Sequence, residues 1–356
     1  MRIALIVPPF IPVPPVRYGG TELFAAHLAI GLKKLGMDVV VYTNGESTVP
    51  VERRWLYSES EWPIITEIHH NLRDANHAAW AIRDAADSCD ILHLNSAPAL
   101  TLSRFVAKPF VYTIHHAHED SLSEFYSYHP DVTYVSISEF QRKLESLPNL
   151  RTIHHGIDES QYHCGNGPRN HLTFLGRIAP VKGAHIAVQV AKRTGIPLKI
   201  AGEVQPVFRD YFEQEVKPHI DGKLIEYVGE ADRALKNELL SQSLGLLFPI
   251  QWDEPFGLAM IEAMACGAPV FALPGGSVAE IVQDGVSGYI CTSVDDLVER
   301  AKRADEFHFA TVRQYVTQNF SVARMVRSYA DLYLEIAGEP STAQSDDESD
   351  SERAIA

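Results

Sequence analysis

Two glutamates flank an apolar run late in the chain, in the stretch EPFGLAMIEAMACGAPV that begins at Glu254. Gly257 opens a predicted helix that runs to about Cys266, and Glu262 lies within it among apolar residues. A carboxylate in such surroundings is costly unless it has a partner. Glu254 precedes the helix, where its side chain can point into a cleft. The pair therefore suits either ligand binding or acid/base chemistry.

Two cations follow a predicted strand in the segment FLGRIAPVKG, which places Arg177 and Lys182 on one loop. Arginine offers a planar fork of donors and lysine a compact charge, so together they can clamp a diphosphate. The alternative is a solvated loop without a ligand. We favour the diphosphate because the loop lies at the carboxyl end of a strand, where ligands bind in open α/β sheets.

A glycine pair, Gly19-Gly20, ends a proline-rich loop directly before a predicted helix. Such a turn lets backbone N–H groups approach an anion, and the helix N-terminus adds partial positive charge. The spacing matches neither the GxGxxG dinucleotide pattern nor the GK[ST] of a P-loop. The pair alone also fits an ordinary turn before a helix.

A histidine cluster, His115, His116 and His118, ends the strand PFVYTIHH and raises the alternative of a metal site. His115 and His116 lie on opposite faces of an extended strand, which disfavours joint coordination. The sequence also lacks a DxD-type carboxylate pair at a strand end. We therefore expect no metal and no cofactor.

The elements that position these residues alternate along the chain between short β-rich runs and longer amphipathic segments, the pattern of an α/β protein. The alternation stops at a polar segment, 158–170, and then restarts, which predicts two parallel sheets facing each other across a cleft. The predicted limits are an N-terminal domain at 1–157, a C-terminal domain at 158–318, a helix at 319–338 that crosses back to the first domain, and a disordered acidic tail at 339–356.

Composition narrows the class of partner. The chain has 356 residues, 46% of them hydrophobic, and a formal net charge of −15, which disfavours nucleic acid as a partner. Its four cysteines show no paired spacing, so we expect a reducing compartment. The sequence shows neither a signal peptide nor an apolar run long enough to cross a membrane, and we expect a cytoplasmic protein. Peripheral membrane contact stays open, and the sequence gives no indication of oligomeric state.

The motifs together resemble those of family 4 glycosyltransferases. The loop Tyr18-Gly19-Gly20, the GRxxxxKG loop of 176–183 and the E-x7-E pair at 254/262 occur in that family's order. The resemblance covers the whole chain except the tail. It implies the GT-B fold, with two Rossmann-like domains and a nucleotide sugar bound mainly by the second. His154-His155 stands where the family usually has Pro-Asn, so the chain departs from the family's pattern at this point.

The resemblance also implies roles for individual residues. Arg177 and Lys182 would neutralise the donor diphosphate, with the backbone of Gly19 and Gly20 closing from the first domain. Glu262 would bind the ribose hydroxyls and Glu254 the donor sugar. Backbone N–H groups around Phe256, Gly257 and Leu258 would hold sugar hydroxyls or phosphate, and His115 would lie where donor and acceptor meet, although the neighbouring His116 is an alternative.

The implied reaction is retaining and metal-independent transfer of a hexosyl group from a nucleotide sugar, with UDP-glucose the first expected donor and GDP-mannose the second. The basic pairs at 33–34 and 53–54 in the first domain are too few for a polybasic membrane patch. This favours a soluble acceptor, whose identity stays open. Two alternative functions are a nucleotide-sugar 2-epimerase and a non-catalytic nucleotide-sugar binder.

Overall fold

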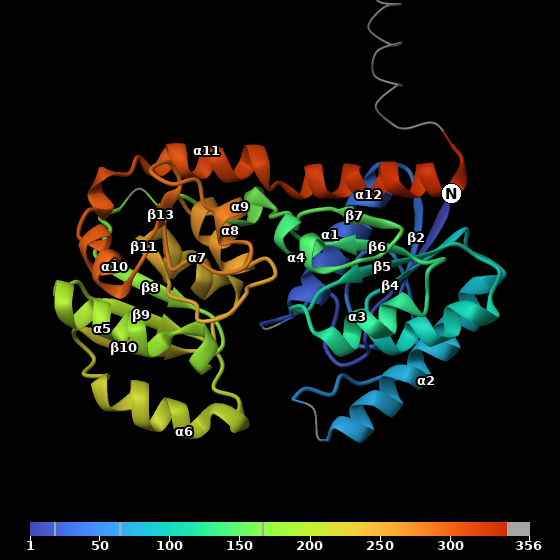
Figure 1. Cartoon of the computed structure of the whole chain (residues 1–356), viewed down its shortest axis with the longest axis horizontal. Coiled ribbons are helices and arrows are strands. Elements are labelled where there is room, and N and C mark those ends of the chain that lie inside the picture. The colour runs from blue at the N-terminus through green and yellow to red at the C-terminus, as the bar shows by residue number, and fades with distance from the viewer. Residues whose placement is uncertain (18, 64–65, 166, 340–356) are drawn as a thin grey trace, which may run out of the picture.

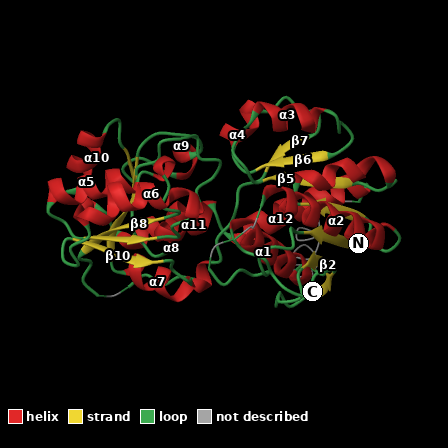
Figure 2. Ribbon diagram, turned by 90° about the horizontal axis from the view of Figure 1, so that it is seen from below, coloured by secondary structure: helices red, strands yellow, loops and turns green. Residues whose placement is uncertain are grey.

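The computed structural model describes residues 1–17, 19–63, 66–165 and 167–339. Two halves, each built on a parallel β-sheet with helices on both faces, lie side by side (Figures 1 and 2). The predicted acidic tail falls almost wholly on 340–356, outside the described residues. Tyr18 also lies outside them. Among the residues described, no helix combines the length and apolarity needed to cross a bilayer.

The first sheet has seven strands in the order β3-β2-β1-β4-β5-β6-β7, all paired in parallel. Its strands are β1 (Arg2–Ile6), β2 (Asp38–Thr43), β3 (Glu52–Trp55), β4 (Ile91–Leu94), β5 (Phe110–Ile114), β6 (Thr133–Ser136) and β7 (Leu150–Thr152). The helices that connect them are α1 (Gly20–Lys34), α2 (Glu67–Ala86), α3 (Asp120–Ser127) and α4 (Glu139–Leu144), with a 3₁₀ segment, η1, at Ala97–Phe105. The strand order reverses between β1 and β4, as in Rossmann-like sheets.

The second sheet repeats this plan with six strands in the order β10-β9-β8-β11-β12-β13. Its strands are β8 (His171–Leu175), β9 (Leu198–Ala201), β10 (Ile225–Gly229), β11 (Ser243–Phe248), β12 (Val270–Ala272) and β13 (Gly288–Ile290). The helices of this half are α5 (Ala184–Thr194), α6 (Arg209–Tyr211), α7 (Arg233–Ser241), α8 (Leu258–Ala265), α9 (Val278–Ile281), α10 (Val294–Ala301) and α11 (Phe309–Asn319), and α12 (Val322–Ala337) follows. The predicted α/β class with two parallel sheets is confirmed.

Strands β4, β5, β8 and β12 are buried along their whole length, most of the other strands are buried at all but one position, and apolar side chains fill both faces of each sheet. One apolar cluster of the first half packs against α1 and α12, a second packs against α2, and a third fills the second half. Burial on both faces explains why runs such as β12 are continuously apolar and easy to recognise in the sequence.

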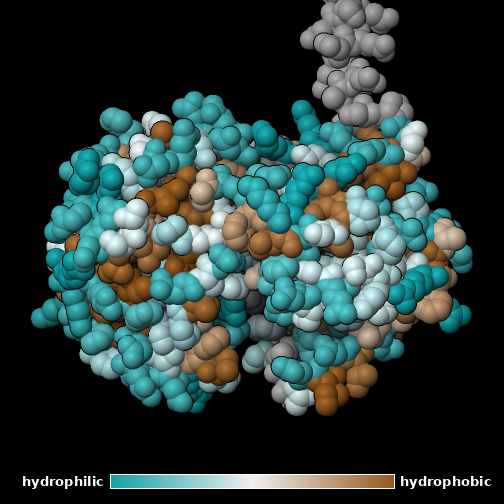
Figure 3. Space-filling model, viewed as in Figure 1, coloured by the Kyte–Doolittle hydropathy of each residue, from teal (hydrophilic) through white to brown (hydrophobic). Residues whose placement is uncertain are grey.

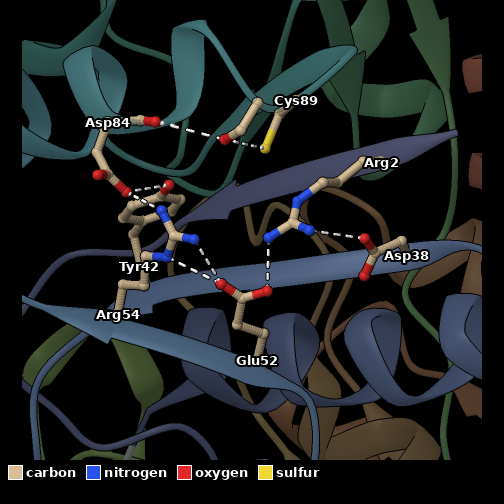
Figure 4. A network of polar contacts seen from close by, with 8 residues as sticks. Arg2, Asp38, Tyr42, Glu52, Arg54, Asp84 and Cys89 are labelled. Carbon is tan, nitrogen blue, oxygen red and sulfur yellow. Dashed lines mark hydrogen bonds and ion pairs between the residues drawn. The ribbon is translucent and has the colours of Figure 1, made fainter.

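Strand β3 was not predicted, because its sequence ERRW is polar. The structure shows it at the sheet edge, where charged side chains hold it in place (Figure 4). Arg2 bonds Glu52 at 2.5 Å, and Arg54 lies between Glu52 and Asp84 and pairs with both. Charged residues on an edge strand also discourage pairing with another chain.

The chain passes between the halves at two adjacent places. Residue Ile157 donates its backbone N–H to Phe320 at 2.7 Å and accepts from Val322 at 2.9 Å. Helix α12 then lies over the first half beside α1 (Figure 1). The predicted limits at 157/158 and 318/319 fall at these crossings, and we propose them as the domain boundaries. The sequence RTIHHGI at 151–157 favours a strand along its whole length, but β7 ends at Thr152, because the chain there leaves the sheet to cross.

A polar contact also links α9 of the second half to the first half. The Glu280 carboxylate accepts hydrogen bonds from the backbone N–H groups of Glu139 and Phe140, at the start of α4. It also pairs with His154 at 3.0 Å. A carboxylate at a helix N-terminus is favourable, because it satisfies free N–H groups and complements the helix dipole.

Candidate functional site

A cleft of about 1080 Å³ lies between the halves and is lined by the carboxyl ends of both sheets. Loops after β1, β4 and β5 line one side, and loops after β8, β9, β10 and β11 line the other. The surface is indented between the halves at the lower centre of Figure 3. The cleft brings together all the predicted site residues: Gly19, Gly20, His115, Arg177, Lys182, Glu254, Phe256, Gly257, Leu258 and Glu262.

The glycine pair lies at the start of α1. Gly19 has φ 143°, which residues with a side chain rarely adopt, and a Cβ there would lie 2.8 Å from the Glu22 carboxylate. Gly20 opens the helix and faces the second half, since a Cβ on it would lie 3.3 Å from Leu258. The N-termini of α1 and α8 therefore approach one another across the cleft, and both present backbone N–H groups.

The two predicted cations differ in their surroundings. Lys182 lies 2.5 Å from the Glu254 carboxylate and 4.6 Å from the centre of the Trp252 ring. Burial lowers its pKa from the usual value, although Glu254 opposes that shift. Arg177 is half-buried in the same cleft and forms no ion pair with any described residue. Its guanidinium is thus available to an anionic ligand.

Glu254 is 6% exposed, and both of its donors reach the same oxygen. Lys182 and the Trp252 indole, at 2.9 Å, both bond Oε2. Within the described residues, no hydrogen bond reaches Oε1. One carboxylate oxygen is therefore fixed by protein donors, and the other is open to a ligand hydroxyl.

Glu262 shows the same division on α8, where it is 4% exposed. Its Oε1 accepts from the Tyr162 hydroxyl at 2.9 Å and from the Lys236 ammonium at 3.0 Å. Its Oε2 receives no hydrogen bond from the described residues. Tyr162 and Lys236 are the partners that a buried carboxylate requires, and sequence reasoning missed both.

Phe256 and Gly257 shape the start of α8. The Phe256 ring is buried and lies 5.1 Å from that of His155, so only its backbone is free to contact a ligand. Gly257 has φ 82° and precedes the first residue of the helix, Leu258. The positive φ turns the chain so that the N-terminal N–H groups of α8 lie at the cleft.

The three neighbouring histidines have different partners. His115 Nε2 bonds Asn95 Oδ1 at 2.9 Å, and the Asn95 amide donates to a β1 carbonyl, so His115 is the donor of this pair. Burial and then the neighbouring His155 hold the pKa of His115 well below its usual value, and the neutral ring keeps an unprotonated Nδ1. His116 bonds the Tyr112 hydroxyl, whereas His118 pairs with Glu145. In the described part of the chain, no three side chains gather as a metal site would require.

The two Rossmann-like sheets and the cleft between them define a GT-B protein. Sucrose-phosphate synthase (tll1590) from Thermosynechococcus elongatus superposes with a TM-score of 0.79 at 19% identity, covering 95% of this chain and 99% of that one. Anabaena Alr3699/HepE, solved in complex with UDP-glucose, gives 0.75 at 16% identity, covering 94% and 100%. At these identities the likeness establishes the fold alone.

Sequence comparison identifies the family. The model for "Glycosyltransferase Family 4" matches residues 18–161, and that for "Glycosyl transferases group 1" matches 162–306. The chain belongs to the family 4 glycosyltransferases, as its motif order predicted.

Two relatives show how far the likeness extends. Mycobacterium tuberculosis glycogen synthase is 24% identical, over 90% of this chain and 92% of that protein. The N-acetyl-alpha-D-glucosaminyl L-malate synthase of Bacillus anthracis is 26% identical, over 58% of each. Family membership favours transfer over the alternatives of 2-epimerisation and binding without catalysis.

Proposed function

We propose that the protein transfers a hexosyl group from a nucleotide sugar to a hydroxyl acceptor, retains the anomeric configuration and needs no metal. The observation that carries the proposal is the pairing, in one cleft, of two half-satisfied carboxylates with cations and helix N-termini. UDP-glucose is the first candidate donor, supported by the similarly folded Anabaena protein solved with that molecule. GDP-mannose is the second.

In the proposed complex, Glu262 Oε2 accepts hydrogen bonds from the ribose hydroxyls, while Tyr162 and Lys236 hold Oε1 in place. Glu254 Oε1 contacts the donor sugar in the same way. Each carboxylate is already oriented by protein donors, so little freedom is lost when the ligand binds.

Arg177, Lys182 and the N-termini of α1 and α8 would stabilise the diphosphate as it leaves. The bond between the anomeric carbon and the diphosphate oxygen breaks, and the diphosphate keeps the electron pair. The acceptor oxygen bonds to the same face of that carbon, and its proton passes to the departing phosphate oxygen. These positive groups stabilise the negative charge that develops on the leaving diphosphate, which is the largest electrostatic change in the reaction.

His115 would contribute as a neutral ring at the boundary between the halves. With Nε2–H directed to Asn95, its Nδ1 can accept a hydrogen bond from a sugar or acceptor hydroxyl. His116 is the less favoured alternative, since its Nε2 is engaged by Tyr112 at 3.1 Å.

The test is a donor panel. The protein is incubated with UDP-glucose, other UDP-hexoses and GDP-mannose, each with and without EDTA, and release of the nucleoside diphosphate is followed. We expect the fastest release from UDP-glucose, unchanged by EDTA. Release that stops in EDTA would overturn metal independence, and absence of release from every donor would overturn the proposed function.

A further inference from the structure

The side of the cleft formed by the first sheet has a polar lining built around a buried carboxylate. Helix α2 contributes His70, Asn71 and Asp74, which lie three and four residues apart and so share one face. Facing loops add further polar side chains, from Asn95, Ser96, Thr101, His116 and Glu119. The donor groups assigned above lie mostly on the opposite side, so this lining is left for the acceptor.

Asp74 stands out because it is charged and only 4% exposed. The Ser96 hydroxyl hydrogen-bonds its carboxylate, and no other side chain of the described residues does so. Burial raises the pKa of Asp74 to about 6, so the group is mainly ionised at neutral pH and above. A buried anion with unused acceptor capacity favours a ligand that brings hydrogen-bond donors.

Positive charge in the cleft is distributed unevenly. Arg177, Lys182 and Lys236 all belong to the second half. In the first half's lining, as described, the only lysine or arginine is Arg17, whose side chain is 62% exposed and 3.6 Å from Glu230. A carboxylate or phosphate placed near Asp74 would meet a like charge with no cation beside it, and like charges disfavour such a complex.

We propose that the acceptor is a polyhydroxylated molecule without a carboxylate or phosphate group, and that one of its hydroxyls donates a hydrogen bond to Asp74. This rests on the proposed function and adds the chemical class of the acceptor. Asp74 thereby determines specificity in two ways: it binds the hydroxyl-bearing acceptor and repels anionic ones. It takes no part in bond breaking.

The first test needs no variant. A metabolite extract from the source organism is separated by anion exchange into an unretained and a retained fraction, and each is incubated with the protein and radiolabelled donor. We expect labelled product from the unretained, non-anionic fraction. Product from the retained fraction alone, or from neither while donor hydrolysis continues, would overturn the proposal. If the protein neither hydrolyses a donor nor binds UDP, the proposed function itself is wrong. That result differs from failure of the acceptor proposal alone, in which donor hydrolysis continues.

The second test replaces the carboxylate. Asp74→Asn keeps the size of the side chain but removes its charge, so we expect the acceptor KM to rise by about ten- to hundredfold, the effect of losing a hydrogen bond to a charged group. The affinity for UDP, measured by calorimetry, should stay as in the wild type. Asp87→Asn, at the exposed end of the same helix, is the matched control.

A purely structural role of Asp74 would instead lower the melting temperature and weaken UDP and acceptor binding together. That result, or an unchanged acceptor KM in a folded Asp74→Asn variant, would overturn the role assigned to Asp74. If the variant does not fold, the fractionation experiment still decides the class of acceptor.

Discussion

Replacing Glu262 by glutamine separates the charge of this side chain from its size. The wild-type carboxylate accepts from Tyr162 and Lys236 through Oε1 and leaves Oε2 without a hydrogen bond from the described residues. Glutamine retains one carbonyl oxygen for the protein donors, but its NH2 group then replaces Oε2, the oxygen proposed to accept from the ribose hydroxyls. The substitution should therefore weaken mainly the binding of the nucleotide.

A hydrogen bond to a charged group contributes about 1.5–3 kcal/mol, so Glu262→Gln should weaken UDP binding by about ten- to hundredfold. Tyr162→Phe is the matched control, because it removes one support and leaves the carboxylate intact. We expect that control to weaken UDP binding less than Glu262→Gln does, because the hydrogen bond it removes lies within the protein and Lys236 still holds Oε1.

The assay is calorimetric titration of the wild type and of Glu262→Gln with UDP and with its 2′-deoxy and 3′-deoxy analogues. If Glu262 binds the ribose, the wild type prefers UDP to at least one analogue, and the variant loses that preference. The affinity lost by removing the ribose hydroxyl and the affinity lost by replacing Glu262 are then not additive. A variant that still discriminates against both analogues as strongly as the wild type would refute the ribose assignment.

Three further changes test other parts of the structure. Arg177→Ala should lower the rate of donor cleavage by ~10²-fold or more, the effect of losing a charge-stabilising donor. The control Arg209→Ala, at an exposed residue, should leave that rate unchanged. A rate for Arg177→Ala equal to that of the wild type would refute the diphosphate assignment. Burial raises the pKa of Glu22 from 4.5 to about 7, so the folded state binds this proton more tightly and wild-type stability falls as pH rises across that interval. Glu22→Gln should therefore stabilise the protein more at pH ~8 than at pH ~5, by roughly 3 kcal/mol at most, and denaturant midpoints that shift equally at both would contradict this. Glu280→Ala should speed hydrogen exchange of the first amides of α4 by about tenfold or more, since their carboxylate acceptor is gone; unchanged protection would show that the contact does not hold the halves together.

The order of elements could be predicted because buried parallel strands are apolar and the helices between them are amphipathic. The amphipathic run at 184–194, for example, indicates a helix, and α5 has these limits, Ala184–Thr194. The helix predicted from Gly257 to about Cys266 is α8, Leu258–Ala265. The polar strand β3 could not be predicted in this way, since its pairing with β2 is supported by ion pairs with Arg2 and Asp84 and not by an apolar pattern in its own sequence.

Some residues of the site could also be predicted from the sequence, and others could not. Glu254 and Glu262 could be predicted as site residues because charge beside or within an apolar segment is unusual. Lys236 and Tyr162 gave no such signal, because each is an ordinary residue on a helix or connecting segment and becomes significant only where the fold brings it to Glu262. Asp74 likewise resembles any polar residue of an amphipathic helix until its burial in the cleft is known.

A crystal structure of the protein with UDP-glucose would show directly whether the cleft binds the donor as proposed. We expect the ribose within hydrogen-bonding distance of Glu262 Oε2, the diphosphate between Arg177 and the start of α1, and the glucose beside Glu254 Oε1. A nucleotide bound elsewhere, or bound in the cleft with its ribose away from Glu262, would contradict it.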